Sequence, residues 1–290
     1  MIYVVIGPTC SGKTSLAISI SERKNNCPII NGDAFQIYQG MDVGTSKIAK
    51  TNQAYDRHYL LDIVSPEETF SVMEYQKVAR KCLDGLLQSN KDVVIVGGTG
   101  LYIKALLYDY EFKEEEQVED LDLENLSNHE LHLLLEKMDK VEASKIHENN
   151  RKRMLRAISM MRKNDYVKSE FIASQEHKII YPDVKIFFLS PNREELYENI
   201  NKRVLEMMDN GLVEEVKGLL DKYNLSLTAR QGIGYKEVIS YLNNEINMEE
   251  CISLIQKRTR NYAKRQITFF KHQFGDLKTY DNKDQVLEDL

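Results

Sequence analysis

Short apolar runs alternate with helical patterns through the first hundred residues of the chain. Three of these runs have the length of buried strands, at residues 2–6, 28–30 and 93–96. Between them, apolar side chains recur at helical spacing, first through Leu16 and Ile20 and later through Tyr75 and Leu83. This alternation predicts βαβ units and therefore an α/β fold with a parallel sheet.

The pattern changes near residue 112. An acidic segment extends from Glu111 to Glu124 and is followed by leucine-rich helical patterns. A strand-like run at 184–189 then resumes the α/β pattern before further helices end the chain. We expect a core interrupted by a mostly helical insertion, with a first part of the core at 1–112, the insertion at 113–182 and the second part, with C-terminal helices, at 183–290.

Directly after the first strand, the chain carries a complete G-x-x-x-x-G-K-T motif. In such a loop the backbone N–H groups surround a diphosphate, Lys13 supplies a cation and the Thr14 hydroxyl suits Mg²⁺. The position between a β-branched strand and an amphipathic helix predicts a core like that of P-loop NTPases, with Mg²⁺ as cofactor. The expected diphosphate ligands are Gly7, Pro8, Thr9, Cys10, Ser11, Gly12, Lys13 and Thr14.

The other two early strands also end in polar residues. Asp33 follows the second strand and Thr99 follows the third. Because the carboxyl ends of parallel strands meet at one edge, both are expected near the bound diphosphate. Two structural alternatives remain open: Asp33 can serve as a turn or N-cap residue, and Gly97 and Gly98 can serve a tight strand-to-helix turn.

Charge adds a second candidate partner. The 290-residue chain has a net charge of −6, which by itself argues against nucleic acid. Two stretches nevertheless contain basic residues and no acidic ones, at 151–163 and at 257–271. In the second stretch Lys257, Arg260, Lys264 and Lys271 share one helical face. A solvated surface is the ordinary role of such a face, and binding of a polyanion is the alternative.

Cysteine usage and hydropathy exclude other classes. Cys10, Cys27, Cys82 and Cys251 are widely spaced, which suggests neither a disulfide framework nor a zinc site. No apolar run has the length of a membrane span, and the first strand begins at Ile2, which leaves no room for a signal peptide. We expect a cytoplasmic protein.

Several segments together resemble one family, the tRNA dimethylallyltransferases of the bacterial type. The resemblance covers nearly the whole chain, and the segments that carry it are 7–14, 33–45, 97–102, 151–157, 230–237 and 259–266. It implies transfer of a five-carbon prenyl group from dimethylallyl diphosphate to N6 of adenine 37 in tRNA, with the anticodon stem-loop as partner. We expect a monomer.

The resemblance also implies roles for individual residues. Asp33 would act as the base that removes a proton from the amine, Thr99 would position the amine or the diphosphate, and Lys13 and Arg230 would bind the leaving diphosphate. Phe35 and Gln36 would fill the gap left by the extruded adenine, although core packing is the alternative for Phe35. The full set expected to bind tRNA is Asp33, Ala34, Phe35, Gln36, Thr99, Lys152, Arg153, Arg156, Lys257, Arg260 and Lys264.

The chain departs from the family at three places. Ala34 stands where many relatives have serine, Asn150 stands where aspartate is common, and the segment from Glu111 to Glu124 is acidic. Two other enzymes remain as alternatives: a P-loop small-molecule or nucleotide kinase, and an isopentenyltransferase that acts on free adenine nucleotides. A GTPase-like switch is disfavoured because no N-K-x-D element is present.

Overall fold

The computed structural model describes residues 1–113 and 121–290, which divide into two compact units. The larger unit contains Met1–Leu107 and Tyr181–Leu290, and the smaller contains Tyr108–Ile180. Residues 114–120, half of the acidic segment noted above, lie outside the described residues. No helix in the described part of the chain is both long enough and apolar enough to cross a membrane.

The larger unit is built on one parallel sheet, as the strand–helix alternation predicts. Its strand order is β3-β2-β4-β1-β5-β6. The strands are β1 (Ile2–Ile6), β2 (Ile29–Asn31), β3 (His58–Tyr59), β4 (Val93–Gly97), β5 (Val184–Leu189) and β6 (Thr279–Tyr280). The α/β fold with a parallel sheet is therefore confirmed. The sequence pattern did not predict β3 and β6, whose two residues each are too few for a periodic signal.

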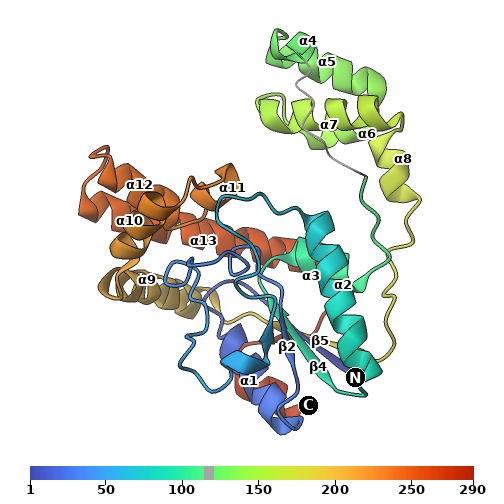
Figure 1. Ribbon diagram of the computed structural model, residues 1–290. Coiled ribbons are helices and arrows are strands. Elements are labelled where there is room, and N and C mark those ends of the chain that lie inside the picture. Colours follow the sequence, from blue (N-terminus) through green and yellow to red (C-terminus); the bar gives the residue numbers. More distant parts are fainter. Residues whose placement is uncertain (114–120) are drawn as a thin grey trace. The chain divides into compact units, whose positions relative to one another are not determined.

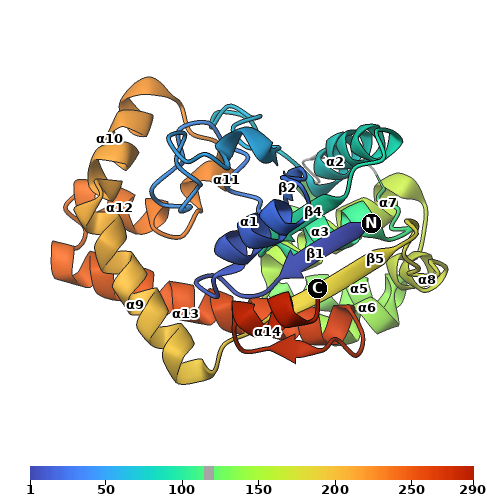
Figure 2. The same ribbon diagram turned by 90° about the horizontal axis from the view of Figure 1, so that it is seen from below.

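Helices cover both faces of the sheet (Figures 1 and 2). On one face, Val5, Val96 and Leu189 pack with α1 (Lys13–Arg23) and α14 (Lys283–Glu288). The other face is covered by α2 (Val72–Gln88), α3 (Gly100–Leu107) and α13 (Met248–Gln273). All residues of β1 and β4 are buried, as expected for strands enclosed on two sides.

A second group of helices packs beside the carboxyl edge of the sheet. It comprises α9 (Arg193–Asp209), α10 (Leu212–Lys222), α11 (Leu227–Arg230) and α12 (Tyr235–Leu242). The short helix η1 (Tyr55–Arg57) lies elsewhere, just before β3, where Arg57 bonds to Ser21 and Asn26 at the end of α1. Helices α9, α10 and α12 surround a core that includes Tyr38, Val204, Leu212, Tyr235 and Ile255. Figure 2 shows α9 and α12 beside α13, and α10 packs against α9 and α12. This core anchors the loop after β2, which forms part of the site below.

The smaller unit is helical and has a core of its own. Buried side chains from successive helices form it, among them Leu131, Leu135, Met154 and Ile158. Its helices are α4 (Leu121–Glu124), α5 (Asn128–Met138), α6 (Lys140–Lys145), α7 (Arg151–Asn164) and α8 (Lys168–Ala173). The start of α5 is a capping box, in which Ser127 and Glu130 satisfy each other's backbone N–H groups.

Candidate active site

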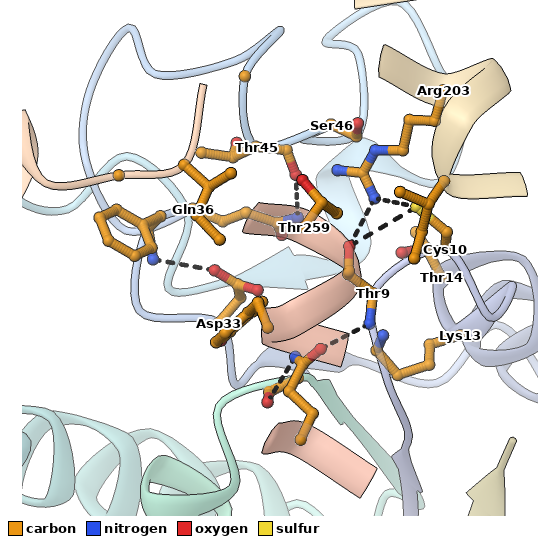
Figure 3. A pocket seen from close by; sticks show the side chains of 18 of the residues that line it. Thr9, Cys10, Lys13, Thr14, Asp33, Gln36, Thr45, Ser46, Arg203 and Thr259 are labelled. Carbon is orange, nitrogen blue, oxygen red and sulfur yellow. Dashed lines mark hydrogen bonds between the residues drawn. The ribbon is translucent and has the colours of Figure 1, made fainter. Parts of the chain in front are cut away.

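Three loops meet at the carboxyl edge of the sheet. In the strand register, Ile6 lies opposite Gly97 and Asn31 lies opposite Val96, so the loops that follow β1, β2 and β4 are neighbours. They border a cavity of about 490 Å³ in the larger unit. Helices α9 and α13 and the segment before α12 complete its lining. Figure 3 shows the polar side chains of this cavity.

The G-x-x-x-x-G-K-T loop forms one wall of the cavity. Thr9, Cys10, Gly12, Lys13 and Thr14 line it, while the remaining loop residues Gly7, Pro8 and Ser11 do not. The backbone at Gly12 has a φ of 86°, a left-handed conformation that glycine adopts without strain. Helix α1 begins at the next residue, so its positive end faces the cavity. This wall has the geometry of a diphosphate cradle.

Lys13 is the buried cation of this wall. Its ammonium group donates to the Pro8 carbonyl oxygen, a bond within the same loop. Burial lowers the pKa of Lys13 to about 8, and the nearby Asp33 carboxylate opposes that effect. The lysine therefore loses its charge at a lower pH than an exposed lysine, and a bound anion would favour its protonated form.

Arg203 supplies a second cation that sequence analysis missed. It lies on α9 between Ile200 and Val204, and its Nη1 donates to Thr9 Oγ1 at 3.0 Å and to Cys10 Sγ at 3.5 Å. Figure 3 shows its guanidinium group pointing at the loop. One signal was available: Ile200, Arg203, Val204 and Met207 have i, i+3, i+4, i+7 spacing, so an arginine falls within an otherwise apolar face.

Asp33 lies across the cavity from the phosphate loop. Its Oδ1 accepts the backbone N–H of Phe35 at 2.9 Å, so the turn interpretation describes its local structure. The same side chain lines the cavity and lies close enough to Lys13 to affect its pKa. The two interpretations of Asp33 are therefore compatible. Phe35 likewise lines the cavity and packs against the second core.

Thr99 stabilises the turn at Asp33 from outside the cavity. Its Oγ1 accepts the backbone N–H of Ala34 at 3.0 Å, and neither residue belongs to the set that lines the cavity. Thr99 thus contacts the residue next to Asp33. Gln36 does line the cavity and donates to the Thr45 carbonyl oxygen at 3.1 Å.

A half-buried carboxylate holds the loop that contains residues 42–46. Glu215 of α10 accepts backbone N–H groups from Asp42 at 3.0 Å, Val43 at 2.6 Å and Gly44 at 3.1 Å. The hydroxyl of Tyr235 also donates to it at 2.6 Å. Charge-assisted bonds of this kind are about twice as strong as neutral ones. Thr45 and Ser46, the next two residues of this loop, therefore have a rigid support where they line the cavity.

Apolar side chains form the remaining wall. Ile200, Val204 and Met207 project from α9, and Ile233 and Ile255 lie beside them. This wall adjoins Arg203, so the cavity has a cationic end and an apolar side. A ligand that combines a diphosphate with a short hydrocarbon would fit both surfaces.

Arg230 lies apart from these groups. Its guanidinium Nε donates to the Leu225 carbonyl oxygen, its side chain is exposed, and it does not belong to the set that lines the cavity. The diphosphate contact expected for Arg230 therefore stays a prediction, and it would require the side chain to leave the Leu225 carbonyl oxygen.

The basic face of α13 is partly exposed. Lys257 and Lys264 are exposed, whereas Arg260 donates to the Asn201 side-chain oxygen of α9 at 2.6 Å. Arg265, one position after Lys264, lines the cavity. The exposed lysines thus lie on the same helix as the cavity wall.

In the helical unit, part of the basic cluster has structural partners. Arg151 donates to main-chain carbonyl oxygens at the end of α4, and Arg153 lies 4.0 Å from Glu142. Lys152, Arg153 and Arg156 have exposed side chains on α7. Arg151 therefore stabilises the unit, whereas the side chains of the other three remain exposed.

The fold and this cavity define a P-loop enzyme whose phosphate cradle opens onto an apolar wall. Comparison with known proteins gives a narrower assignment. The model of the IPP transferase family matches residues 36–273. The tRNA dimethylallyltransferase of Bacillus mycoides is 39% identical over 290 residues, which is 98% of this chain and 90% of the relative.

Solved structures agree. The tRNA delta(2)-isopentenylpyrophosphate transferase of Staphylococcus epidermidis is 38% identical with a TM-score of 0.70, and the match covers 98% of this chain and 93% of that one. A eukaryotic dimethylallyltransferase acting on tRNA is 25% identical with a TM-score of 0.84, covering 99% and 75%. The chain belongs to the IPP transferase family.

Proposed function

We propose that the protein transfers a dimethylallyl group from dimethylallyl diphosphate to N6 of adenine 37 in tRNA and releases diphosphate. The observation that carries this proposal is the cavity itself, in which a diphosphate cradle, an apolar wall and the Asp33 carboxylate face one another. The family assignment supports the same reaction, since the named relatives are tRNA prenyltransferases.

Different residues of the cavity act on the leaving diphosphate and on the acceptor amine. The amine nitrogen forms a bond to the allylic carbon while the carbon–oxygen bond breaks, and the diphosphate leaves with the electron pair. Lys13, Arg203 and the N–H groups at the start of α1 stabilise the charge that develops on the leaving oxygen. Asp33 accepts the proton that the amine loses as the new bond forms.

Mg²⁺ fits the donor set of the phosphate loop. The Thr14 hydroxyl lines the cavity and would hold the ion together with diphosphate oxygens, which are the hard ligands that Mg²⁺ prefers. Within residues 1–113 and 121–290 there is no group of three or more His, Cys, Asp or Glu side chains suited to a metal. The ion would supply charge neutralisation on the diphosphate.

We infer that tRNA contacts exposed basic residues of α13 and of the helical unit. The exposed Lys257 and Lys264 support contact with the phosphates of an anticodon stem, and Arg260 is held beside them by Asn201. Lys152, Arg153 and Arg156 provide exposed charge on the helical unit, residues 108–180. Ala34, Phe35 and Gln36 would meet the anticodon loop around the extruded adenine, with Thr99 bonded to Ala34.

We propose that the protein acts as a monomer. We place its action in the cytoplasm, where its tRNA substrate would be met.

The direct test offers one labelled donor to competing acceptors. Purified protein and Mg²⁺ are incubated with radiolabelled dimethylallyl diphosphate, unmodified tRNA with adenine at position 37, AMP and ATP. Label in tRNA supports the proposal, and loss of transfer with guanine at position 37 locates the acceptor. Label in a mononucleotide would favour the enzyme that prenylates free nucleotides. Label in neither, with turnover of ATP, would favour the kinase.

The two exposed lysines of α13 predict a salt effect. Replacing both Lys257 and Lys264 by alanine should weaken tRNA binding and reduce the slope of log K against log salt concentration by about 1.5, because each lost phosphate contact removes about 0.7 to 0.9. The measurement is a filter-binding titration at several salt concentrations. Lys77→Ala with Lys81→Ala, two exposed lysines of α2, is the matched control. An unchanged slope would assign the α13 lysines to a solvated face.

The lowered pKa of Lys13 predicts an alkaline limit. As pH rises through about 8, Lys13 loses its proton in the free enzyme, so kcat/KM for the donor should fall above that pH. In a Lys13→Arg variant the rate is lower but this alkaline decline should be absent, because arginine stays charged. A wild-type profile that is flat to pH 9.5 would contradict the assignment of Lys13 to donor binding.

A further inference from the structure

Gln266 is a buried polar residue with no role in the reaction as described above. It lies on α13, is 5% exposed, and lines the cavity together with Thr259 and Tyr262. These three residues follow i, i+3, i+7 spacing, so one face of α13 points into the cavity. Lys257 and Lys264 lie on the same helix and are exposed. A buried amide on such a helix needs hydrogen-bond partners.

The amide of Gln266 bonds to two different loops. Its Oε1 accepts the backbone N–H of Thr9 in the phosphate loop at 2.8 Å, and its Nε2 donates to the Gly98 carbonyl oxygen at 2.9 Å. These loops follow β1 and β4. Gly98 is suited to this approach, since a Cβ there would lie 2.4 Å from Gln266 Nε2. One side chain therefore connects both loops through main-chain atoms.

The connection extends to the groups that act on each substrate. On one side, the Thr9 hydroxyl accepts a hydrogen bond from Arg203 at 3.0 Å. On the other side, Gly98 is followed by Thr99, whose Oγ1 accepts the N–H of Ala34 at 3.0 Å. Ala34 is the neighbour of Asp33 in the chain. The diphosphate cradle and the Asp33 turn are thus linked through the Gln266 amide.

We propose that Gln266 is a positioning residue that sets the separation between the diphosphate cradle and Asp33. This inference rests on the proposed function, in which the allylic carbon must lie beside the acceptor amine when the diphosphate leaves. Reacting atoms need an approach of about 3 to 3.5 Å, and an error of about 1 Å can cost about 100-fold in rate. Gln266 acts on the alignment of the two substrates rather than on the affinity for either one.

The chemistry of the amide makes the role testable by single substitutions. The bridge requires one acceptor and one donor on the same planar group, which only glutamine supplies at this length. Gln266→Met keeps the length and removes both functions. Gln266→Glu keeps the acceptor for Thr9 N–H, but as a carboxylate it places an oxygen against the Gly98 carbonyl oxygen and breaks that half of the bridge.

The experiment is a single-turnover measurement on the full chain at saturating donor and tRNA. Both Gln266 variants should transfer the prenyl group about 10- to 100-fold more slowly, as misalignment predicts. The dissociation constants for tRNA and for inorganic diphosphate should stay within about twofold of the wild-type values, because each loop keeps its own ligands. Gln256→Met is the matched control, since Gln256 lies on the same helix and its side chain donates to the Asn201 carbonyl oxygen of α9, away from both loops.

Several outcomes would overturn the inference. Wild-type rates in both variants would show that the bridge is dispensable. A loss confined to binding, or an equal loss in Gln256→Met, would assign the effect to the helix as a whole. If Gln266→Met fails to fold, as judged by its thermal midpoint, Gln266→Glu decides the question by the same criteria. Absence of transfer by the wild-type protein would instead overturn the proposed function.

Discussion

Replacing Asp33 by alanine is expected to slow prenyl transfer by about 100- to 10,000-fold while tRNA binding changes little. An exocyclic adenine amine is a weak nucleophile because its lone pair is delocalised into the ring, so removal of its proton contributes much of the rate. Asp33 lines the cavity opposite the phosphate loop, and its Oδ1 is held by the N–H of Phe35. The measurement is a single-turnover rate at saturating substrates, with tRNA affinity measured separately.

Two further variants separate the chemical role of Asp33 from its role in the turn. Asp33→Asn keeps an oxygen for the N–H of Phe35 but cannot accept the proton, so it should be nearly as slow as Asp33→Ala. Asp56→Ala, at an exposed aspartate of η1, controls for the loss of one negative charge. A near-normal rate in Asp33→Asn would remove Asp33 from the role of base and leave it as a turn residue.

The firmest predictions came from local chemistry at strand ends. The loop at 7–14 has fixed spacing and follows a buried strand, so its position and its wall of the cavity could be inferred before any tertiary contact was known. Parallel pairing then brings Asp33 to the same edge, because the register is set by strands that are buried on both faces. These features depend on few residues that are close in sequence.

The missed features depend on tertiary packing. Arg203 reaches Thr9 only because α9 packs beside α13, and these residues are 194 positions apart in the chain. The bridge from Gln266 to Gly98 spans 168 positions. Helical periodicity marks which face of each helix is apolar, but it does not say which loop that face will meet. Similarly, β6 has only two residues, and its pairing with β5 comes from the path of the chain.

Tertiary packing also explains why basic residues of one cluster differ in their contacts. The sequence pattern treated the six basic residues at 151–163 as one candidate surface. In the structure, Arg151 bonds to the carbonyl oxygens that end α4, while Lys152 is exposed. An unpaired helix end attracts a donor, and the arginine that satisfies it is determined by the packing of α7 on α5. Charge patterns therefore indicate a candidate surface, and contacts decide which members can bind a partner.

Arg203→Ala is expected to raise the dissociation constant for inorganic diphosphate by about 10- to 150-fold, since a hydrogen bond to a charged group contributes about 1.5 to 3 kcal/mol. The guanidinium group is half-buried and already held against the phosphate loop by Thr9, so little side-chain entropy is lost on binding. Lys202→Ala removes an exposed charge one position earlier on the same helix and should have little effect. Isothermal titration with diphosphate and Mg²⁺ measures the dissociation constant of diphosphate for the wild type, Arg203→Ala and Lys202→Ala.

The comparison with Arg230→Ala decides between the arginine implied by family resemblance and the one placed at the cavity. Arg230 is exposed and donates to the Leu225 carbonyl oxygen, so it would have to give up that bond and order its side chain before it could reach the diphosphate. We therefore expect the loss of affinity in Arg230→Ala to be clearly smaller than in Arg203→Ala. A larger loss in Arg230→Ala would mean that α11 moves over the bound donor, and that the second cation of the cradle comes from α11 rather than from α9.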